Sequence, residues 1–205
     1  GRPARGGGIF TPEGIYQAGE PAPPGGEPPL ARCAWETNRD AVVFGSFSKY
    51  FSMTGWRIGW MLVPTHLRRA VEVLTGNFTI CPPALSQRAA LAAFTEESYA
   101  ELDAHVREYA ATRALVLRRL AEMGIDQVAP ADGAFYVYAN IAHLTDDSMA
   151  WVKQLLVDTG VAVTPGIDFD TEHGHEFVRF SFAADIDQVA AALDRLEAWL
   201  PSPPH

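Results

Sequence analysis

The sequence predicts an α/β protein. Short apolar runs typical of strands recur along the chain, and segments with apolar residues at helical spacing separate them. Gly and Pro mark the boundaries between these segments, and 205 residues are enough to bury a sizeable core. This alternation is typical of helices packed on small or mostly parallel sheets.

The first half of the chain contains two predicted strands and two predicted helices. The Pro- and Gly-rich stretch 21–29 is expected to be a loop, because these residues suit neither helix interiors nor central strands. The apolar run 41–45 predicts a buried strand of a mostly parallel sheet, and 57–63 predicts the next strand. Apolar residues at helical spacing then predict helices over 65–74 and 83–94.

A long helical pattern follows Thr95, which suits an N-cap, and it ends at Gly124. A helix of this length suggests a bridge between two domains. After it, shorter elements alternate to the end of the chain, which is typical of a small α/β domain. The predicted strands are 135–138, 161–163 and 177–182, and the predicted helices are 149–157 and 186–200.

Composition excludes several classes of partner. The formal net charge of −9 argues against nucleic acid and against an anionic membrane surface. No apolar run is long enough to span a bilayer, and we expect no secretory signal at the start of the chain. Cys33 and Cys81 lie far apart, and the histidines are scattered, so neither a disulfide scaffold nor a metal site is expected. We expect a soluble cytoplasmic protein.

The most informative segment is residues 46–59, which read Ser-Phe-Ser-Lys-Tyr-Phe-Ser-Met-Thr-Gly-Trp-Arg-Ile-Gly. Lys49 stands three positions after Ser46 and eight positions before Arg57. This segment resembles the cofactor-lysine signature of the class I/II aminotransferases, which use pyridoxal 5′-phosphate (PLP). The resemblance implies a PLP-dependent transferase fold of type I.

The chemistry of PLP explains these residue types. A lysine amine condenses with the PLP aldehyde to form a Schiff base, and lysine suits this role because desolvation or nearby cations readily remove its proton. The resemblance therefore assigns the Schiff base to Lys49. The phosphate needs its own partners at a fixed distance, and the resemblance assigns these to the Ser46 hydroxyl and the Arg57 guanidinium.

Arg179 is the candidate for substrate binding. It stands in the context Val-Arg-Phe-Ser-Phe-Ala, where the family places an arginine that grips the α-carboxylate of the amino acid. The alternative is a half-exposed strand arginine in a surface ion pair. The segment Thr164-Pro165-Gly166 before Phe169 resembles a loop that lies beside the substrate in the family, although Pro-Gly also suits an ordinary turn.

Tyr16 is a further candidate for cofactor binding. The family carries an Asp-x-x-Tyr element, in which the Asp pairs with the pyridinium nitrogen and the Tyr hydrogen-bonds the phenolic oxygen of PLP. The segment that aligns with it here is Glu13-Gly14-Ile15-Tyr16, which has a longer carboxylate. Whether Glu13 replaces the Asp stays open.

The resemblance also implies how much of the fold is present. Family members are about twice as long, with the cofactor lysine past their middle, so this chain resembles the C-terminal half of such an enzyme. Residues 1–95 are then expected to be the C-terminal part of the large PLP-binding domain, and residues 96–205 the bridging helix and small domain. The intact family forms its site across a homodimer. Aspartate-type members carry an arginine near residues 76–78, and its absence here argues against a dicarboxylic substrate.

The expected activity is transfer of an amino group between an amino acid and a 2-oxo acid through a Lys49 Schiff base. Three alternatives are open. PLP-dependent lyases and synthases carry the same signature, and the chain could be a non-catalytic remnant that binds PLP weakly. Ser46-x-x-Lys49 also matches the nucleophile pair of penicillin-recognising enzymes, but their Ser-Asp-Asn and Lys-Thr-Gly partners are absent.

Overall fold

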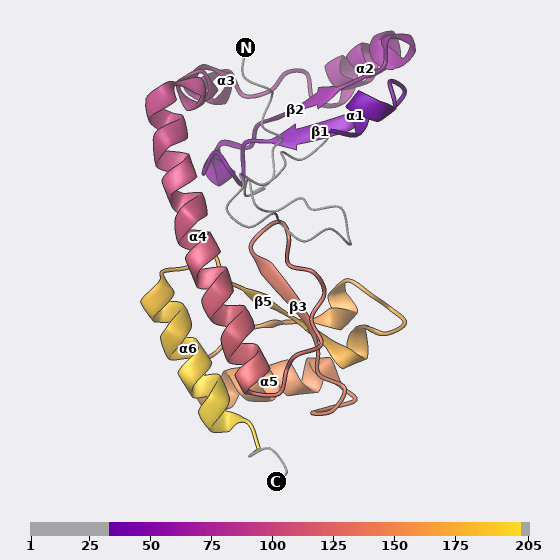
Figure 1. Ribbon diagram of the computed structural model, residues 1–205. Coiled ribbons are helices and arrows are strands. Elements are labelled where there is room, and N and C mark those ends of the chain that lie inside the picture. Colours follow the sequence, from indigo (N-terminus) through magenta and orange to yellow (C-terminus); the bar gives the residue numbers. More distant parts are fainter. Residues whose placement is uncertain (1–32, 202–205) are drawn as a thin grey trace. The chain divides into compact units, whose positions relative to one another are not determined.

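The computed structural model describes residues 33–201 (Figure 1). The chain forms two compact units that divide between Val106 and Arg107. The division lies within α4, Glu96–Glu122, the long helix that the sequence predicts. The assignment of residues 1–95 and 96–205 to two parts of a larger fold stays a prediction. Tyr16 and Glu13 lie outside the described residues.

In the first unit, a two-stranded ribbon precedes a series of helices. Strands β1 (Val43–Ser46) and β2 (Gly59–Leu62) are antiparallel, and the last residue of β1 pairs with the first residue of β2. The two strands therefore frame residues 47–58. The elements of this unit, in chain order before α4, are α1 Ala34–Thr37, β1 Val43–Ser46, η1 Thr54–Trp56, β2 Gly59–Leu62, α2 Thr65–Phe78, α3 Ala84–Ala90 and η2 Ala92–Phe94.

The buried position predicted for β1 is wrong within the described residues, because Phe44 is 73% exposed. Its described partner β2 is antiparallel, and one antiparallel pair is compatible with the mostly parallel sheet expected of the large domain. A parallel pair needs a crossover connection, usually a helix, whereas residues 47–58 contain only a single 3-10 turn and return the chain directly. An apolar run predicts a strand, but the pairing direction depends on the connection that follows it.

The first unit has an aromatic core. Phe47 and Phe51, from the connection between β1 and β2, lie with ring centroids 4.8 Å apart, and Phe94 packs edge-on against both. This core buries the connection rather than the strands. Its buried residues are Phe47, Tyr50, Phe51, Ala90, Ala93, Leu102 and Val106.

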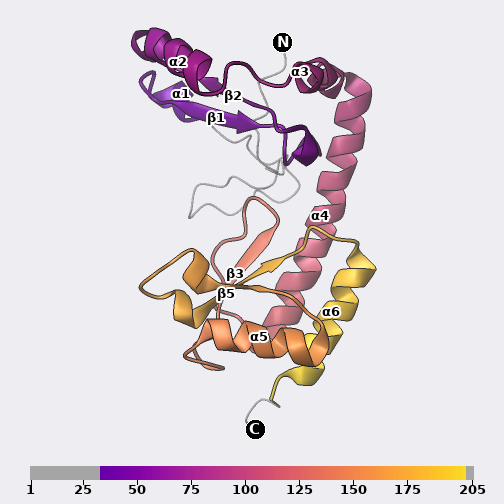
Figure 2. The ribbon, with the colours of Figure 1, turned by 180° about the vertical axis from the view of Figure 1, so that it is seen from behind.

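The second unit contains an antiparallel sheet of three strands, β3 (Tyr136–Asn140), β4 (Thr164–Pro165) and β5 (Phe177–Ser181). Their order in the sheet is β3-β5-β4, and helices cover the sheet (Figure 2). The prediction of a strand over 161–163 is wrong, because these residues precede β4 and the ladder starts only where Thr164 pairs with Arg179. Other elements agree with the sequence to within a few residues. After α4 they are β3 Tyr136–Asn140, α5 Ser148–Thr159, β4 Thr164–Pro165, η3 Gly166–Asp168, η4 Gly174–Glu176, β5 Phe177–Ser181 and α6 Ile186–Trp199.

Alternation along β3 and β5 gives this sheet two different faces. One face packs against the helices and is buried; its side chains are Val137, Ala139, Val178 and Phe180. The intervening residues Tyr136, Tyr138 and Arg179 are only partly buried and lie on the opposite face, because successive strand side chains point to opposite sides. The alternating pattern therefore places Arg179 on the face that the helices do not cover.

Local signals fix the ends of the helices in this unit. Asp147 accepts a hydrogen bond from the Ala150 N–H at the start of α5, and Asp185 accepts one from the Asp187 N–H at the start of α6. Gly160 ends α5 with φ +73°, and Gly124 follows α4 with φ +81°. These glycines adopt the left-handed conformation that their positions after the helices favour.

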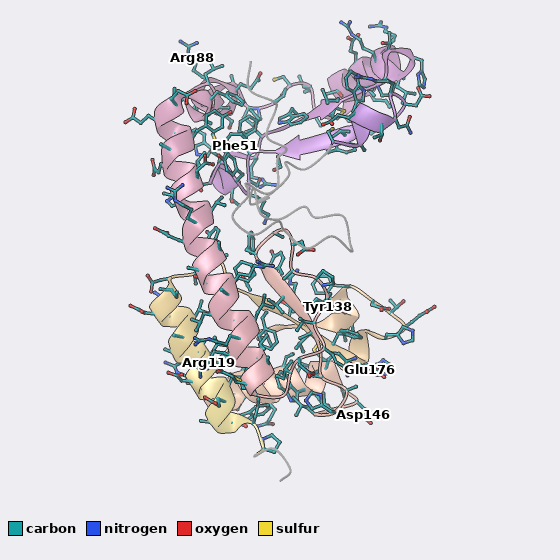
Figure 3. The ribbon with its side chains drawn as sticks, viewed as in Figure 1. Phe51, Arg88, Arg119, Tyr138, Asp146 and Glu176 are labelled. Carbon is teal, nitrogen blue, oxygen red and sulfur yellow. The ribbon has the colours of Figure 1, made fainter. Side chains whose placement is uncertain are left out.

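Arg119 joins α4 to α6 in this unit (Figure 3). Its Nη2 donates to Asp194 Oδ1 at 2.8 Å and to Glu197 Oε2 at 2.9 Å, and its side chain is only 16% exposed. The hydrogen bond to Asp194 and the charges of both acids raise the pKa of Arg119. The three side chains form a network at the edge of the core.

Arg119→Met is expected to lower the free energy of unfolding by about 1 kcal/mol, because it leaves Asp194 and Glu197 without their shared partner. Urea denaturation followed by circular dichroism measures this. Arg118→Met, at the exposed neighbouring position, is the matched control and should change stability by less than about 0.5 kcal/mol. Equal losses in both variants would contradict a special role for Arg119.

Candidate active site

The loop of residues 47–58 is closed at its base by backbone contacts. Ser46 pairs with Gly59, and the Phe47 N–H donates to the Ile58 carbonyl at 3.2 Å. The strands approach so closely here that a Cβ atom on Gly59 would lie 2.7 Å from the carbonyl oxygen of Gly45. Ser46 and residues next to Ile58 are thus brought to the same end of the ribbon.

Aromatic side chains anchor this loop. Phe47, Tyr50 and Phe51 are each about 95% buried, and the Tyr50 O–H donates to Asp103 Oδ1 of α4 at 2.6 Å. Lys49 lies between these anchors and is exposed. The buried aromatic neighbours of Lys49 fix the backbone that carries it. Their side chains point into the core, whereas the lysine side chain stays outside it.

Backbone hydrogen bonds inside the loop make it compact. The Ser48 N–H donates to Ser46 Oγ at 3.0 Å, and the Ser52 N–H donates to the Lys49 carbonyl at 2.9 Å. The Met53 N–H donates to the Phe47 carbonyl at 3.0 Å. The loop therefore has a defined shape, which a site for a rigid ligand requires.

Arg57 adopts a left-handed backbone conformation with φ +50°. A non-glycine residue rarely adopts this conformation, and such positions concentrate at functional sites. The Nη1 of Arg57 donates to the Thr54 carbonyl at 2.9 Å, and no carboxylate within residues 33–201 forms an ion pair with it. Its charge remains available to an anion.

The chemistry of this loop fits PLP. Residues 46–59 contain an amine, a guanidinium and several hydroxyls but no acidic residue, so the loop carries two positive charges. A phosphate favours such a set of donors. Lys49 would hold the aldehyde carbon, and Ser46 and Arg57 would hold the phosphate. When bound, PLP supplies an electron sink for charge that develops at the substrate Cα.

Arg179 forms a second candidate site on the face of the β3-β5-β4 sheet that is opposite the helices. It pairs across the ladder with Tyr138 on one side and with Thr164 on the other, and its Nη2 donates to Thr164 Oγ1 at 3.3 Å. Its guanidinium carbon lies 4.1 Å from the ring centroid of Tyr136 and 4.5 Å from that of Phe169. Its buried Nε has no acceptor.

Tyr138, which is labelled in Figure 3, pairs with Arg179 across the ladder and lies against Gly166, the residue after β4. Its ring stacks on Phe177 with centroids 4.9 Å apart and an interplanar angle of 6°. Its buried hydroxyl has no hydrogen-bond partner and would lie 2.7 Å from a Cβ on Gly166. Burial, and to a smaller extent the charge of Asp170, raise the pKa of Tyr138 above its usual value.

Comparison with known proteins identifies the family. Residues 13–196 match the family described as aminotransferase class I and II. The chain belongs to this family. Its members use PLP, which agrees with the donors on the loop of residues 46–59. The fold is accordingly that of a type I PLP-dependent transferase, present in part.

Known members resemble this aminotransferase chain over most of its length. The valine–pyruvate aminotransferase of Mycobacterium tuberculosis is 59% identical over 174 residues, which are 85% of this chain and 45% of that protein. A crystal structure of an aminotransferase from M. tuberculosis matches with a TM-score of 0.84 and 56% identity, covering 92% of this chain and 46% of the other. The aromatic aminotransferase of Pyrococcus horikoshii matches with a TM-score of 0.70 and 32% identity, covering 77% and 42%.

This aminotransferase chain therefore spans about half the length of the relatives it matches. The structure places Ser46, Lys49 and Arg57 on or beside one loop of the first unit, and Arg179 on the sheet of the second unit. Tyr16 and Glu13 fall outside the described residues. The individual roles of these residues stay predictions.

The sequence did not indicate several residues that shape these sites. Asp103 lies far along the chain from Tyr50, and no local pattern connects them. Nor did the sequence indicate that the Tyr136 ring lies against Arg179, on the sheet face opposite the helices. Strand alternation shows only that Tyr136 and Tyr138, two residues apart in β3, share one face.

The described part of the chain shows neither a metal-binding cluster nor a membrane-spanning helix. Residues 33–201 contain no group of three or more His, Cys, Asp or Glu side chains that could hold a metal ion. Within the same range, no helix combines the length and the apolar character needed to cross a membrane.

Proposed function

We propose that this chain is part of a PLP-dependent aminotransferase that moves an amino group between an amino acid and a 2-oxo acid. The observation that carries this proposal is the loop of residues 46–59, which holds Lys49 and Arg57 on a rigid aromatic base without any acidic side chain. Family membership supplies the type of cofactor, and the loop supplies the groups that would hold it.

Lys49 has two proposed roles in this reaction. Its amine would hold PLP at the aldehyde carbon. The same amine, when free, would carry a proton to or from the substrate Cα, as a general base and acid. Ser46 and Arg57 would hold the phosphate, so that the substrate Cα stays within reach of the Lys49 amine.

Arg179 is proposed to bind the α-carboxylate of the substrate. Its guanidinium has an unpaired Nε–H and no acidic partner within the described residues, so it retains both the charge and the donors that a carboxylate needs. Tyr16 is proposed to hydrogen-bond the phenolic oxygen of PLP, with Glu13 in place of the Asp that pairs with the pyridinium nitrogen.

The proposed substrates are a neutral amino acid and pyruvate. The relative from M. tuberculosis that is 59% identical is named for valine and pyruvate, and this chain lacks an arginine near residues 76–78 that would favour a dicarboxylic side chain. Valine with pyruvate is therefore the first pair to test.

A cytoplasmic homodimer is proposed for the intact enzyme. The distribution of exposed apolar side chains supports the presence of further protein, from the same chain or from a partner, packed against the first unit. Of the 18 large hydrophobic side chains exposed within residues 33–201, 13 lie between Val42 and Phe94, and five lie in the second unit. Apolar surface concentrated in this way marks an interface or a face that packs against more of the fold.

Formation of alanine is the test of this function. The chain is incubated with PLP, valine and pyruvate, and alanine and the 2-oxo acid from valine are measured together with ammonia. Equal amounts of alanine and 2-oxo acid, which require Lys49, support transamination. Release of ammonia without an acceptor would instead assign a lyase. No product with any amino donor would favour the non-catalytic alternative.

A further inference from the structure

Arg179 differs from the other partly buried arginines of the second unit, Arg113 and Arg119, in the groups that hold it. Arg119 is held by Asp194 and Glu197, and Arg113 lies 3.7 Å from Asp132. Arg179 is partly buried but contacts two aromatic rings and one hydroxyl, with no carboxylate partner in the part of the chain that the structure describes. A partly buried cation without an acidic partner needs another source of stabilisation.

We propose that Tyr136 and Phe169 are positioning residues that hold the Arg179 guanidinium by stacking, in place of an acidic partner. The guanidinium carbon lies 4.1 Å and 4.5 Å from the two ring centroids, well within the range of a cation–π contact. The inference rests on the proposed function in taking a substrate carboxylate as the ligand of Arg179.

The geometry of a guanidinium explains why rings serve this role better than an acid. Its N–H groups point outward in the plane of the group, whereas aromatic rings contact its faces. Stacking therefore fixes the plane without occupying the N–H edges that bind a carboxylate. An aspartate in the same place would occupy an edge and neutralise the charge, and both effects would weaken binding of a substrate carboxylate.

The position of Phe169 is fixed by the backbone that carries it. The Phe169 and Asp170 N–H groups both donate to the Gly166 carbonyl, at 2.9 and 3.0 Å. Asp170 Oδ1 accepts hydrogen bonds from the N–H groups of Glu172 and His173, at 2.8 and 3.1 Å. These contacts close a compact turn, so Phe169 stays near Arg179 although 52% of its side chain is exposed.

Tyr138 supports Phe169 from the sheet. The two rings meet edge-to-face, with centroids 6.2 Å apart and an interplanar angle of 88°. Tyr138 itself is held by its stacking on Phe177. Phe169 is thus fixed by its turn and by one neighbouring ring, and Arg179 is held by the two rings and by Thr164.

The test measures the order of Arg179 and its affinity for a carboxylate separately. The NMR signal of the Arg179 Nε–Hε group reports order, and titration with pyruvate, followed on the same signal, reports affinity. The variants are Phe169→Leu and Tyr136→Leu, with Phe169→Tyr and Tyr136→Phe as conservative changes. Phe78→Leu is the matched control, because Phe78 is 82% exposed and lies in the other unit. Circular dichroism verifies that each variant is folded.

Both leucine variants are expected to lose the ordered Arg179 signal and to bind pyruvate about fivefold to tenfold more weakly. The conservative variants and Phe78→Leu should match the parent chain. An ordered Arg179 signal and unchanged affinity in folded leucine variants would overturn the inference. If pyruvate leaves Arg179 of the parent chain unaffected, the carboxylate role in the proposed function fails, and the order of the signal alone then decides whether the rings position the arginine.

Discussion

Lys49→Ala is expected to remove the absorption band at about 420 nm that the chain develops with added PLP. This band reports a protonated Schiff base, which needs an amine held against the aldehyde. Lys49 is exposed on a loop whose neighbours Phe47, Tyr50 and Phe51 are buried, so its replacement should leave the loop folded. The measurement is an absorbance titration of the chain and the variant with PLP.

The second lysine of the chain provides a matched control for this experiment. The chain contains only two lysines, Lys49 and Lys153, and Lys153 is exposed on α5 in the second unit. Lys153→Ala should therefore keep the band if it arises at the proposed site. A band that survives in Lys49→Ala would assign the Schiff base to another amine and refute the proposed site.

The affinity for PLP is a separate part of the same expectation. Because the chain spans about half the length of its relatives, we expect it to supply only part of the contacts to the PLP ring. We expect a dissociation constant for PLP above about 1 μM, because fewer contacts are available to offset the entropy that PLP loses on binding. Free-PLP absorbance in both the parent chain and Lys49→Ala would leave the family membership intact and identify the chain as catalytically inactive by itself.

Gly174→Ala is expected to lower the free energy of unfolding of the second unit by about 3 kcal/mol. A Cβ atom there would lie 2.4 Å from the Gly166 carbonyl oxygen and 2.6 Å from the Ile167 nitrogen. These are backbone atoms, which cannot move aside as a flexible side chain can. The Gly174 carbonyl also accepts a hydrogen bond from the buried Ser148 hydroxyl at 2.8 Å, which ties this position to α5.

Urea unfolding followed by tryptophan fluorescence measures this effect, since Trp151 and Trp199 contact one another in the core of the second unit. Gly76→Ala is the matched control. Gly76 lies within α2, and a Cβ there would meet nothing within 4 Å, so the change should be neutral or stabilise by up to about 1 kcal/mol. Gly174→Ala with parental stability would show that the two backbone segments can separate at little cost.

The stacking of Tyr136 and Phe169 on Arg179 connects this stability to binding. Gly166 and Gly174 allow the backbone approach that closes the turn before Phe169, so a substitution that opens the turn should also release the ring. Such a substitution would then lower the stability of the second unit and also loosen the Arg179 side chain, because the contacts of this turn contribute to both.

Much of the secondary structure could be predicted from the sequence. The period of apolar residues identified α2, α4, α5 and α6, and Thr95 and Gly124 marked the two ends of α4. These signals are local, because helix periodicity, caps and turns depend on residues a few positions apart. The spacing of Ser46, Lys49 and Arg57 is equally local, and for that reason it indicated the family and the candidate cofactor lysine.

Only the tertiary structure decided the remaining features. The antiparallel pairing of β1 with β2, the tether from Tyr50 to Asp103, and the two rings beside Arg179 all join residues that no local pattern connects. The physical reason is that pairing direction and side-chain neighbours depend on how the chain returns in space. A sequence states which side chains share a strand face, but only the folded chain determines what lies against that face.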